Sequence, residues 1–387
     1  MEPLLPEADG VSSLALSLIR ASERLRTAFH PITRKAVAGL VRSMNSYYSN
    51  LIEGHRTKPR DIDAALAKQF SSDPGRRLLQ VQHVAHMEVQ ADMEERLLKV
   101  PAFEVCSIEF LRWIHEGFYR RLPEEFRQIK DEKGKLHHVA PGQLRESEVS
   151  VGRHLAPRSD SLGDFLKRFA EFYGPLVSEA PSSLIAAAAA HHRLAWIHPF
   201  LDGNGRVARL FTYAWFVKAG IDSDGLWTLS RGLARRQAEY RAALANADEK
   251  RLNDYDGRGY RSQRYLGEFC EFFLRTAVDQ VQFMEELLGL DSIRARILGF
   301  TDRKESAGEL PSGAGLVLQE IFLRGEMARG EVPRIIGASP RTGQKLTGTL
   351  LAERLVSSAT PKGPLRLAFP GEAAAHYFPN LYPAGDD

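Results

Sequence analysis

The stretch HPFLDGNGRVAR, from His198 to Arg209, decides the fold predicted for the centre of this chain. The Ala-rich run LIAAAAAHHRLAW before it and the run RVARLFTYAWFVKAG after it consist largely of strong helix formers. Gly220 is suited to the position just after the second helix. The stretch is therefore predicted to be a loop that joins two helices.

The glycine-rich part of this loop has the composition of an anion-binding turn. Gly203, Asn204 and Gly205 can adopt positive φ at low cost, so successive backbone N–H groups can point to one place at the start of the second helix. The helix dipole favours an anion there. Arg206 and Arg209 are three residues apart on that helix, and both guanidinium groups can bind phosphate oxygens.

Two further residues of the loop suggest chemistry. Asp202 offers a hard oxygen ligand for Mg²⁺, which proteins usually hold through one or two carboxylates together with substrate phosphates. His198 titrates near neutral pH and can take a proton from an attacking hydroxyl. Taken singly, a His before Pro is more often a structural loop residue and GNG more often a simple turn.

Together these residues resemble a known signature. HPFLDGNGRVAR matches every specified position of H-x-F-x-[DE]-G-N-G-R-x-x-R, the motif of the Fic family (filamentation induced by cAMP). The resemblance implies Mg²⁺-dependent transfer of AMP from ATP to a Ser, Thr or Tyr hydroxyl of a target protein, with release of pyrophosphate. The related death-on-curing toxins, which act as kinases, have lysine where this chain has Gly205, so the glycine favours nucleotidyl transfer.

The resemblance also implies a role for each residue of the motif. His198 would be the general base, Phe200 a buried anchor and Asp202 the metal ligand. The ATP phosphates would bind the residues of the turn and the helix behind it, which are Gly203, Asn204, Gly205, Arg206 and Arg209.

A second motif lies far upstream, in SNLIEG from Ser49 to Gly54. On its own it is a helix end with a solvated glutamate. Beside the downstream motif it resembles the inhibitory helix of one Fic subgroup, [ST]-x-x-x-E-[GN]. That resemblance implies that Glu53 pairs with Arg209 and occupies the place of the ATP γ-phosphate, so that the resting enzyme is mostly inactive.

The segment between residues 131 and 157 is predicted to be non-helical, with turns near Gly134 and Gly142 and a strand-like alternation toward Val151. We expect one short β-hairpin. It resembles the Fic flap, which registers a target segment by adding it as a strand. The matching elements are PG-x-x-R and V-x-[IV]-G, here Pro141, Gly142, Arg145, Val149, Val151 and Gly152.

The remaining chain is predicted to be mainly helical. Amphipathic helices fill residues 12–99, and one continuous helix is expected to run from about 264 through DSIRARILGFTDR. His83 and His86 are predicted to lie on a helix surface. Tyr240 either borders an adenine pocket or packs in the core. The predicted fold is mainly helical and has three parts. Residues 1–104 form an N-terminal helical region, residues 105–300 a Fic helical core with a β-hairpin flap, and residues 311–387 a C-terminal winged helix-turn-helix domain.

The C-terminal part combines three helical patterns with two strand-like segments around Pro-Lys-Gly-Pro, an order that resembles a winged helix. Lys and Arg outnumber Glu between Pro311 and Phe369. Arg341, Thr342, Gln344 and Lys345 would begin a recognition helix, and Lys362 would lie in the wing. Use of the domain for protein contacts is an equal alternative to DNA binding.

Composition limits the other partners. The chain has 387 residues, 43% of them hydrophobic, and a net charge of +3, too small to demand a nucleic-acid partner. It shows no signal peptide and no long apolar run, and its two cysteines form no disulfide or metal pattern, so a cytoplasmic protein without a membrane partner is predicted. The resemblance permits self-modification and a dimer or tetramer.

Two alternatives to a simple AMP transferase stay open at this point. One is a DNA-binding regulator whose Fic site only senses nucleotide. The other is an enzyme that both adds and removes AMP, with Glu53 positioning a water.

Overall fold

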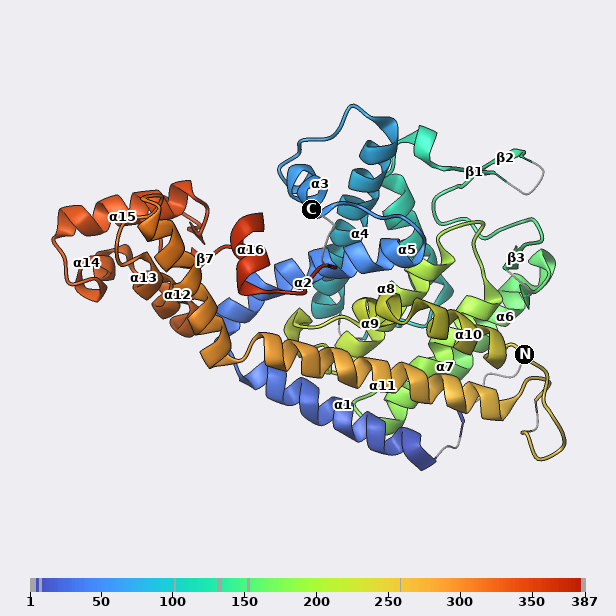
Figure 1. Ribbon diagram of the computed structural model, residues 1–387. Coiled ribbons are helices and arrows are strands. Elements are labelled where there is room, and N and C mark those ends of the chain that lie inside the picture. The colour runs from blue at the N-terminus through green and yellow to red at the C-terminus, as the bar shows by residue number, and fades with distance from the viewer. Residues whose placement is uncertain are drawn as a thin grey trace.

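The computed structural model describes residues 5–6, 9–100, 102–130, 134–151, 154–257 and 259–383. Helices dominate it, as predicted, and the strands form only small two- and three-stranded sheets (Figure 1). None of the helices in these ranges is long and apolar enough to cross a membrane.

Four helices form the N-terminal region: α1 (Asp9–Thr27), α2 (Pro31–Ile52), α3 (Pro59–Leu66) and α4 (Pro74–Lys99). Proline stands in the first turn of the last three, where its missing N–H costs nothing. Helix α1 lies along α11 (Gln263–Leu287), and α2 packs between α4 and α9 (Leu229–Arg235). The prediction for His83 and His86 was wrong, because both are fully buried between these helices.

The central helices are α5 (Ile108–Arg120), α6 (Leu162–Tyr173), α7 (Pro181–Ile197), α8 (Asn204–Lys218) and α10 (Gln237–Ala247). Ser107 caps α5, its hydroxyl accepting from the Phe110 N–H. Helix α7 lies in the middle and contacts α1, α6, α8 and α11. Its run of fully buried alanines, Ala186 to Ala190, lets those neighbours approach closely. Short 3₁₀ turns complete the region: η1 (Glu124–Phe126), η2 (Ser159–Ser161), η3 (Gly174–Leu176) and η4 (Ser223–Gly225).

The predicted single hairpin is instead two small antiparallel pairs. Strand β1 (Gln128–Lys130) pairs with β2 (Leu136–His138), and β3 (Ser150–Val151) pairs with β4 (His154–Leu155). Between them the chain passes through the turn at Gly142, whose φ is +74°. The long segment is divided because Arg145 and Gly142 bond inward to the core, as described below.

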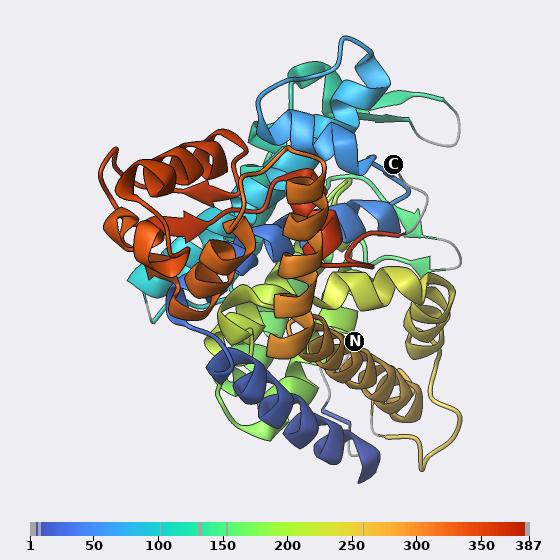
Figure 2. The ribbon, with the colours of Figure 1, turned by 60° about the vertical axis from the view of Figure 1, so that its left-hand side comes forward.

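The continuous helix expected beyond α11 is interrupted. Helix α11 ends at Leu287, and after Leu288 and Gly289 the chain begins α12 (Leu290–Ser306), which packs against α13 (Ala314–Arg324) and α16 (Gly371–Tyr377). The rest of this C-terminal part contains η5 (Arg329–Glu331), α14 (Val332–Ile335), α15 (Pro340–Ala352), β5 (Glu326–Met327), β6 (Val356–Ser357) and β7 (Leu365–Leu367). The sheet has the order β5-β7-β6. Figure 2 shows this part, in orange and red, standing beside the helical core.

Candidate active site

The loop predicted from the sequence joins α7 to α8, and two left-handed residues give it its shape. His198 ends α7 with φ +50° and ψ +60°, its N–H donating to Leu194 O at 3.1 Å. Gly203 precedes α8 with φ +79°. A Cβ at Gly203 would lie 2.9 Å from the Tyr119 ring, so glycine is required there for both conformation and space. A non-glycine residue in this conformation, as at His198, is uncommon and costs free energy that the fold must supply.

The side chain of Asn204 closes this loop on itself. Its Oδ1 accepts from Phe200 N at 2.9 Å, and its Nδ2 donates to Phe200 O at 2.8 Å. Phe200 is fully buried, as predicted for an anchor. The Asn204 amide is therefore used for loop geometry, and the groups left for an anion are the backbone N–H groups in the first turn of α8, which have no partner within the helix.

His198 is poised as a neutral imidazole. Burial lowers its pKa to about 4, so the ring is uncharged at neutral pH. Its Nδ1 lies 3.3 Å from Ala195 O. Because a carbonyl only accepts, the proton is on Nδ1 and the lone pair on Nε2. The backbone of His198 is also fixed, since Arg145 Nε donates to its carbonyl at 2.8 Å.

Asp202 is held by two donors at one carboxylate oxygen. Tyr119 OH donates to Oδ2, and Arg206 Nη2 lies 3.2 Å from the same atom. Burial alone would raise the pKa of Asp202, but Arg206 and the Tyr119 hydrogen bond lower it below its ordinary value, so the group is a carboxylate. The Asp202 side chain is 40% exposed.

These features fit a Mg²⁺ ion that is shared with a substrate. Over the described ranges, no group of three or more His, Cys, Asp or Glu side chains could hold a metal ion. One charged, partly exposed carboxylate beside an anion-binding helix end is instead the usual arrangement for Mg²⁺ bound together with phosphates.

Arg206 has donors to spare for an anion. Its guanidinium stacks over the Phe118 ring at 4.6 Å and is nearly inaccessible to solvent. Apart from the contact of Nη2 to Asp202, its Nε and Nη1 groups are buried and have no hydrogen-bond partner in the part of the chain that the structure describes. Buried unpaired donors are costly unless a ligand uses them.

Glu53 and Arg209 meet although the sequence separates them by more than 150 residues. Arg209 Nη2 donates to Glu53 Oε1 at 2.7 Å, while its Nε donates to Ser49 Oγ at 2.9 Å and its Nη2 to Ser49 O at 2.9 Å. Burial would raise the pKa of Glu53, but Arg209 and Arg206 lower it, so the carboxylate stays charged.

The Glu53 carboxylate lies on the first turn of α8. A Cβ built at Gly205 would be 2.1 Å from Glu53 Oε1 and 3.0 Å from Arg209 Nη1. Gly54 ends the helix with φ +86°, and Gln237 Nε2 donates to Ile52 O at 2.8 Å. The end of α2 is thus held against α8 and α10, with a negative charge where the helix dipole favours an anion.

Two residues at this site were not singled out in the sequence. His115 Nδ1 accepts from Gly142 N at 2.9 Å, so its Nε2 carries the proton and donates to Asp202 O at 3.2 Å. Its ring stacks on Phe200 at 4.1 Å with an interplanar angle of 8°. Tyr119 lies one turn further along α5. Their spacing of four in IHEGFY was the available signal, since it puts both on one helix face.

The flap residues are only partly described. Ser150 and Val151 form β3, and Ala156 N donates to Val149 O at 3.2 Å. Gly152 lies outside the described residues. Arg145 ties the base of the flap to the loop, because its backbone N–H donates to Pro199 O at 3.0 Å and its guanidinium bonds to the carbonyls of His198, Ser147 and Pro157.

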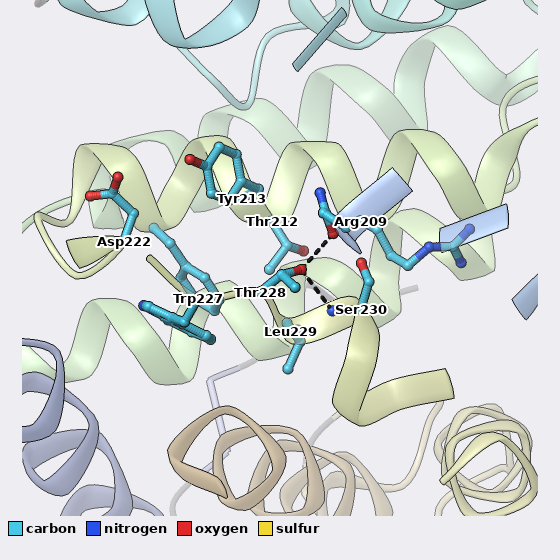
Figure 3. A pocket seen from close by; sticks show the side chains of 10 residues that line it. Arg209, Thr212, Tyr213, Asp222, Trp227, Thr228, Leu229 and Ser230 are labelled. Carbon is cyan, nitrogen blue, oxygen red and sulfur yellow. Dashed lines mark hydrogen bonds between the residues drawn. The ribbon is translucent and has the colours of Figure 1, made fainter. Parts of the chain in front are cut away.

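A small pocket lies behind Arg209, between α2, α8 and the start of α9 (Figure 3). There Thr228 Oγ1 donates to Asn45 Oδ1 of α2 and accepts from Ser230 N at 3.2 Å. Tyr240, for which two roles were open, is a core residue: it is buried and its hydroxyl lies 2.7 Å from His191 Nε2.

The comparisons with known proteins agree with this geometry. Residues 105–216 match the sequence model of the Fic/DOC family. A Fic family protein from Desulfovibrio desulfuricans G20, known from a crystal structure, shares the fold over 95% of this chain and 98% of its own, with a TM-score of 0.54 and 17% identity. Residues 105–216 are thus similar in sequence to the Fic/DOC family, and the chain as a whole is similar in fold to a Fic family protein.

Two curated relatives carry the same printed name, protein adenylyltransferase Fic. The protein of Nematostella vectensis is 29% identical over 178 residues, 45% of this chain and 37% of the relative. The protein of Drosophila willistoni is 32% identical over 114 residues, 28% of this chain and 23% of the relative. The chain therefore aligns with less than half the length of these relatives.

Proposed function

We propose that this protein is a self-inhibited AMP transferase, which moves AMP from ATP to a Ser, Thr or Tyr hydroxyl of a target protein. The observation that carries the proposal is the Glu53 carboxylate on the first turn of α8, paired with Arg209. An anion already occupies the place that phosphate would take, beside a neutral histidine and a charged carboxylate. The names of the two relatives support the same reaction.

In the proposed reaction, His198 Nε2 takes the proton of the target hydroxyl. The hydroxyl oxygen forms a bond to the α-phosphorus of ATP, the bond from that phosphorus to the bridging oxygen breaks, and pyrophosphate leaves. The backbone N–H groups at the start of α8 and the guanidinium groups of Arg206 and Arg209 hold the phosphates and stabilise their charge. Mg²⁺ on Asp202 would neutralise phosphate charge when bound.

The flap residues Val149, Val151 and Gly152 are proposed to register the target segment as an added strand. Short strand β3 supports this, because among the described residues it pairs only with β4, and the other edge of a strand can accept an extended segment. The target therefore presents its hydroxyl from an extended segment.

The same carboxylate explains why the resting protein would be inactive. Glu53 neutralises Arg209 and repels a phosphate that approaches the first turn of α8. ATP would then lack a partner for its γ-phosphate and would not align its α-phosphorus with His198. Removing the carboxylate leaves both the guanidinium and the helix end available.

A DNA-binding regulator remains the second candidate, because one surface of the C-terminal part favours it. Arg341, Thr342, Gln344 and Lys345 on α15 are all exposed, as is Lys362 between β6 and β7. Exposed cations on a helix that follows a short helix and turn suit contacts with a DNA groove.

The test incubates wild type, Glu53→Gly and Glu53→Gly with His198→Ala in cell lysate with α-labelled ATP and Mg²⁺. We expect label on protein with Glu53→Gly, far above wild type, and none with the double variant. Absence of label from all three would contradict the transferase. DNA binding that depends on nucleotide and survives His198→Ala would then support the regulator.

A further inference from the structure

The C-terminal part of the chain contacts the first turn of the inhibitory helix α2 and the residues just before it. Thr33 is buried, and its Oγ1 donates to Phe322 O at the end of α13, at 2.7 Å. The Phe29 and Phe322 rings meet edge to face at 5.9 Å. Gly325 has φ +79°, and a Cβ there would lie 2.1 Å from His30 Nδ1. The two parts are therefore in close contact just where α2 starts.

A second set of contacts lies further along α2 and nearer to Glu53. It is made by residues 380–382, which follow α16 and which we call the α2 strap. Tyr382 OH lies 3.1 Å from Ser43 Oγ, and its ring meets the Tyr47 ring edge to face at 5.1 Å. Tyr48 OH donates to Leu381 O at 3.0 Å. Figure 1 shows this segment in dark red beside α2.

The strap is itself anchored away from α2. Arg231 of α9 donates to Asn380 O at 3.2 Å, and the start of α16 abuts α3, where a Cβ at Gly371 would be 2.0 Å from Asp63 Oδ2. The strap is thus attached to α9 through Asn380, and α16, which precedes it, contacts α3. Because neither attachment involves α2, the strap can restrain the helix that it crosses.

Much of the remaining contact between α2 and its neighbours is polar. The buried polar side chains of α2 include Ser43, Asn45, Ser46, Ser49 and Asn50. Some are paired, as Asn45 Nδ2 with Gln90 Oε1 at 2.7 Å. Among the described residues, some buried atoms of α2 and α4 have no hydrogen-bond partner: Asn50 Oδ1, His83 Nδ1 and both ring nitrogens of His86. Unpaired buried atoms of this kind cost free energy, which weakens the hold of α4 on α2.

We propose that the α2 strap is the restraint that keeps Glu53 in the phosphate site, so that displacing the strap activates the enzyme. The proposal rests on the proposed function. Tyr48 directly precedes Ser49, and Ser49 and Glu53 both bond to Arg209, so loosening the helix at Tyr48 loosens the inhibitory contacts within about one turn. Any partner that draws the C-terminal part away from α2 would thus relieve inhibition.

The experiment compares Tyr382→Ala with wild type in the full chain, by AMP transfer in lysate and by hydrogen exchange of the α2 amides. Loss of one aromatic pair and one hydrogen bond should raise the fraction of molecules in which Glu53 has left Arg209. AMP transfer should rise with that fraction, by roughly three- to tenfold. The α2 amides should exchange faster by a similar factor. Tyr255→Ala is the matched control, because Tyr255 is 99% exposed, and it should match wild type in both measurements.

Epistasis shows whether the effect passes through Glu53. In a Glu53→Gly background, Tyr382→Ala should add nothing to transfer, and a further rise of the same size would overturn the proposal. Unchanged transfer and exchange in Tyr382→Ala would overturn it as well. Tyr382→Phe keeps the ring and replaces the alanine variant if that variant does not fold. Its AMP transfer and α2 exchange should lie between those of wild type and those expected for Tyr382→Ala. Wild-type values in both assays would count against the strap.

The proposed function can fail separately. If Glu53→Gly transfers no label, the transferase is wrong, whereas α2 exchange in Tyr382→Ala still reports whether the strap holds the helix. If Glu53→Gly is active and Tyr382→Ala behaves as Tyr255→Ala does, the strap proposal alone is wrong.

Discussion

Gly205 is a residue at which one added methyl group would displace the Glu53 carboxylate. The Glu53 carboxylate occupies the space of a Cβ there, at 2.1 Å. Gly205→Ala should therefore force Glu53 away from Arg209 and lower the free energy of unfolding by about 1–2 kcal/mol, between the values for exposed and buried ion pairs. In Glu53→Gly the same substitution should be nearly neutral, because only the flexible end of Arg209, with Nη1 3.0 Å from that Cβ, remains to shift, and alanine favours a helix. Chemical denaturation of the four proteins measures this; an equal loss in both backgrounds would contradict the prediction.

Single residues of the motif were predictable because they are adjacent in the sequence. His198, Asp202, Arg206 and Arg209 share one loop and one helix, so their proximity needs no tertiary information. The use of the Asn204 amide to close the loop was not predictable. It depends on the left-handed backbone at His198 and Gly203, which the surrounding structure imposes.

Among the elements, α5 supports the loop between α7 and α8, because His115 and Tyr119 both donate hydrogen bonds to Asp202. Tyr119→Phe keeps the ring that packs on Gly203 but removes the donor to Asp202 Oδ2. Loss of such a supporting hydrogen bond usually weakens metal binding by about 10-fold or more. We therefore expect the Mg²⁺ concentration for half-maximal transfer to rise by about that factor in a Glu53→Gly background.

Two measurements keep this prediction specific. The melting temperature of Tyr119→Phe should stay near that of its parent, and the KM for the protein target should not change. The role assigned to Tyr119 would be wrong if Mg²⁺ dependence were unaltered while kcat fell, since that pattern would indicate a general loss of site geometry.

Element boundaries followed the local signals where such signals existed. Proline lies in the first turn of α2, α3 and α4, and Ser107 caps α5. The break at Gly289 was missed because apolar periodicity continues on both sides of it. His83 and His86 were misplaced because α4 buries polar groups against the polar face of α2, and hydrophobic patterning cannot detect such an interface.

On the scale of the molecule, Glu53 and Arg209 are brought together by the packing of α2 on α4, α8 and α9. The motif at Ser49 to Gly54 indicated the pairing only through resemblance. Nothing in the local sequence could show that residues 380–382 would lie against the same helix, because contacts over more than 300 residues are settled by the whole fold.

The same arrangement predicts how nucleotides stabilise the whole protein. With Glu53 in place, the Arg209 guanidinium is neutralised, so the third phosphate of ATP gains no partner and ATP should raise the melting temperature no more than ADP. Without the carboxylate, the third phosphate can form a charge-assisted bond with Arg209, worth about 1.5–3 kcal/mol. Tighter binding then shifts the folding equilibrium by mass action, by a few degrees for a chain of this size.

The measurement compares Mg²⁺ with ADP and Mg²⁺ with ATP on His198→Ala and on His198→Ala with Glu53→Gly, so that no ATP is consumed by transfer. An advantage of ATP over ADP should appear only in the second protein. If that advantage were present with Glu53 intact, the carboxylate would not be competing with the third phosphate. If it were absent from both proteins, Arg209 would not be its binding partner, and the inhibitory effect of Glu53 would have to come from a different phosphate.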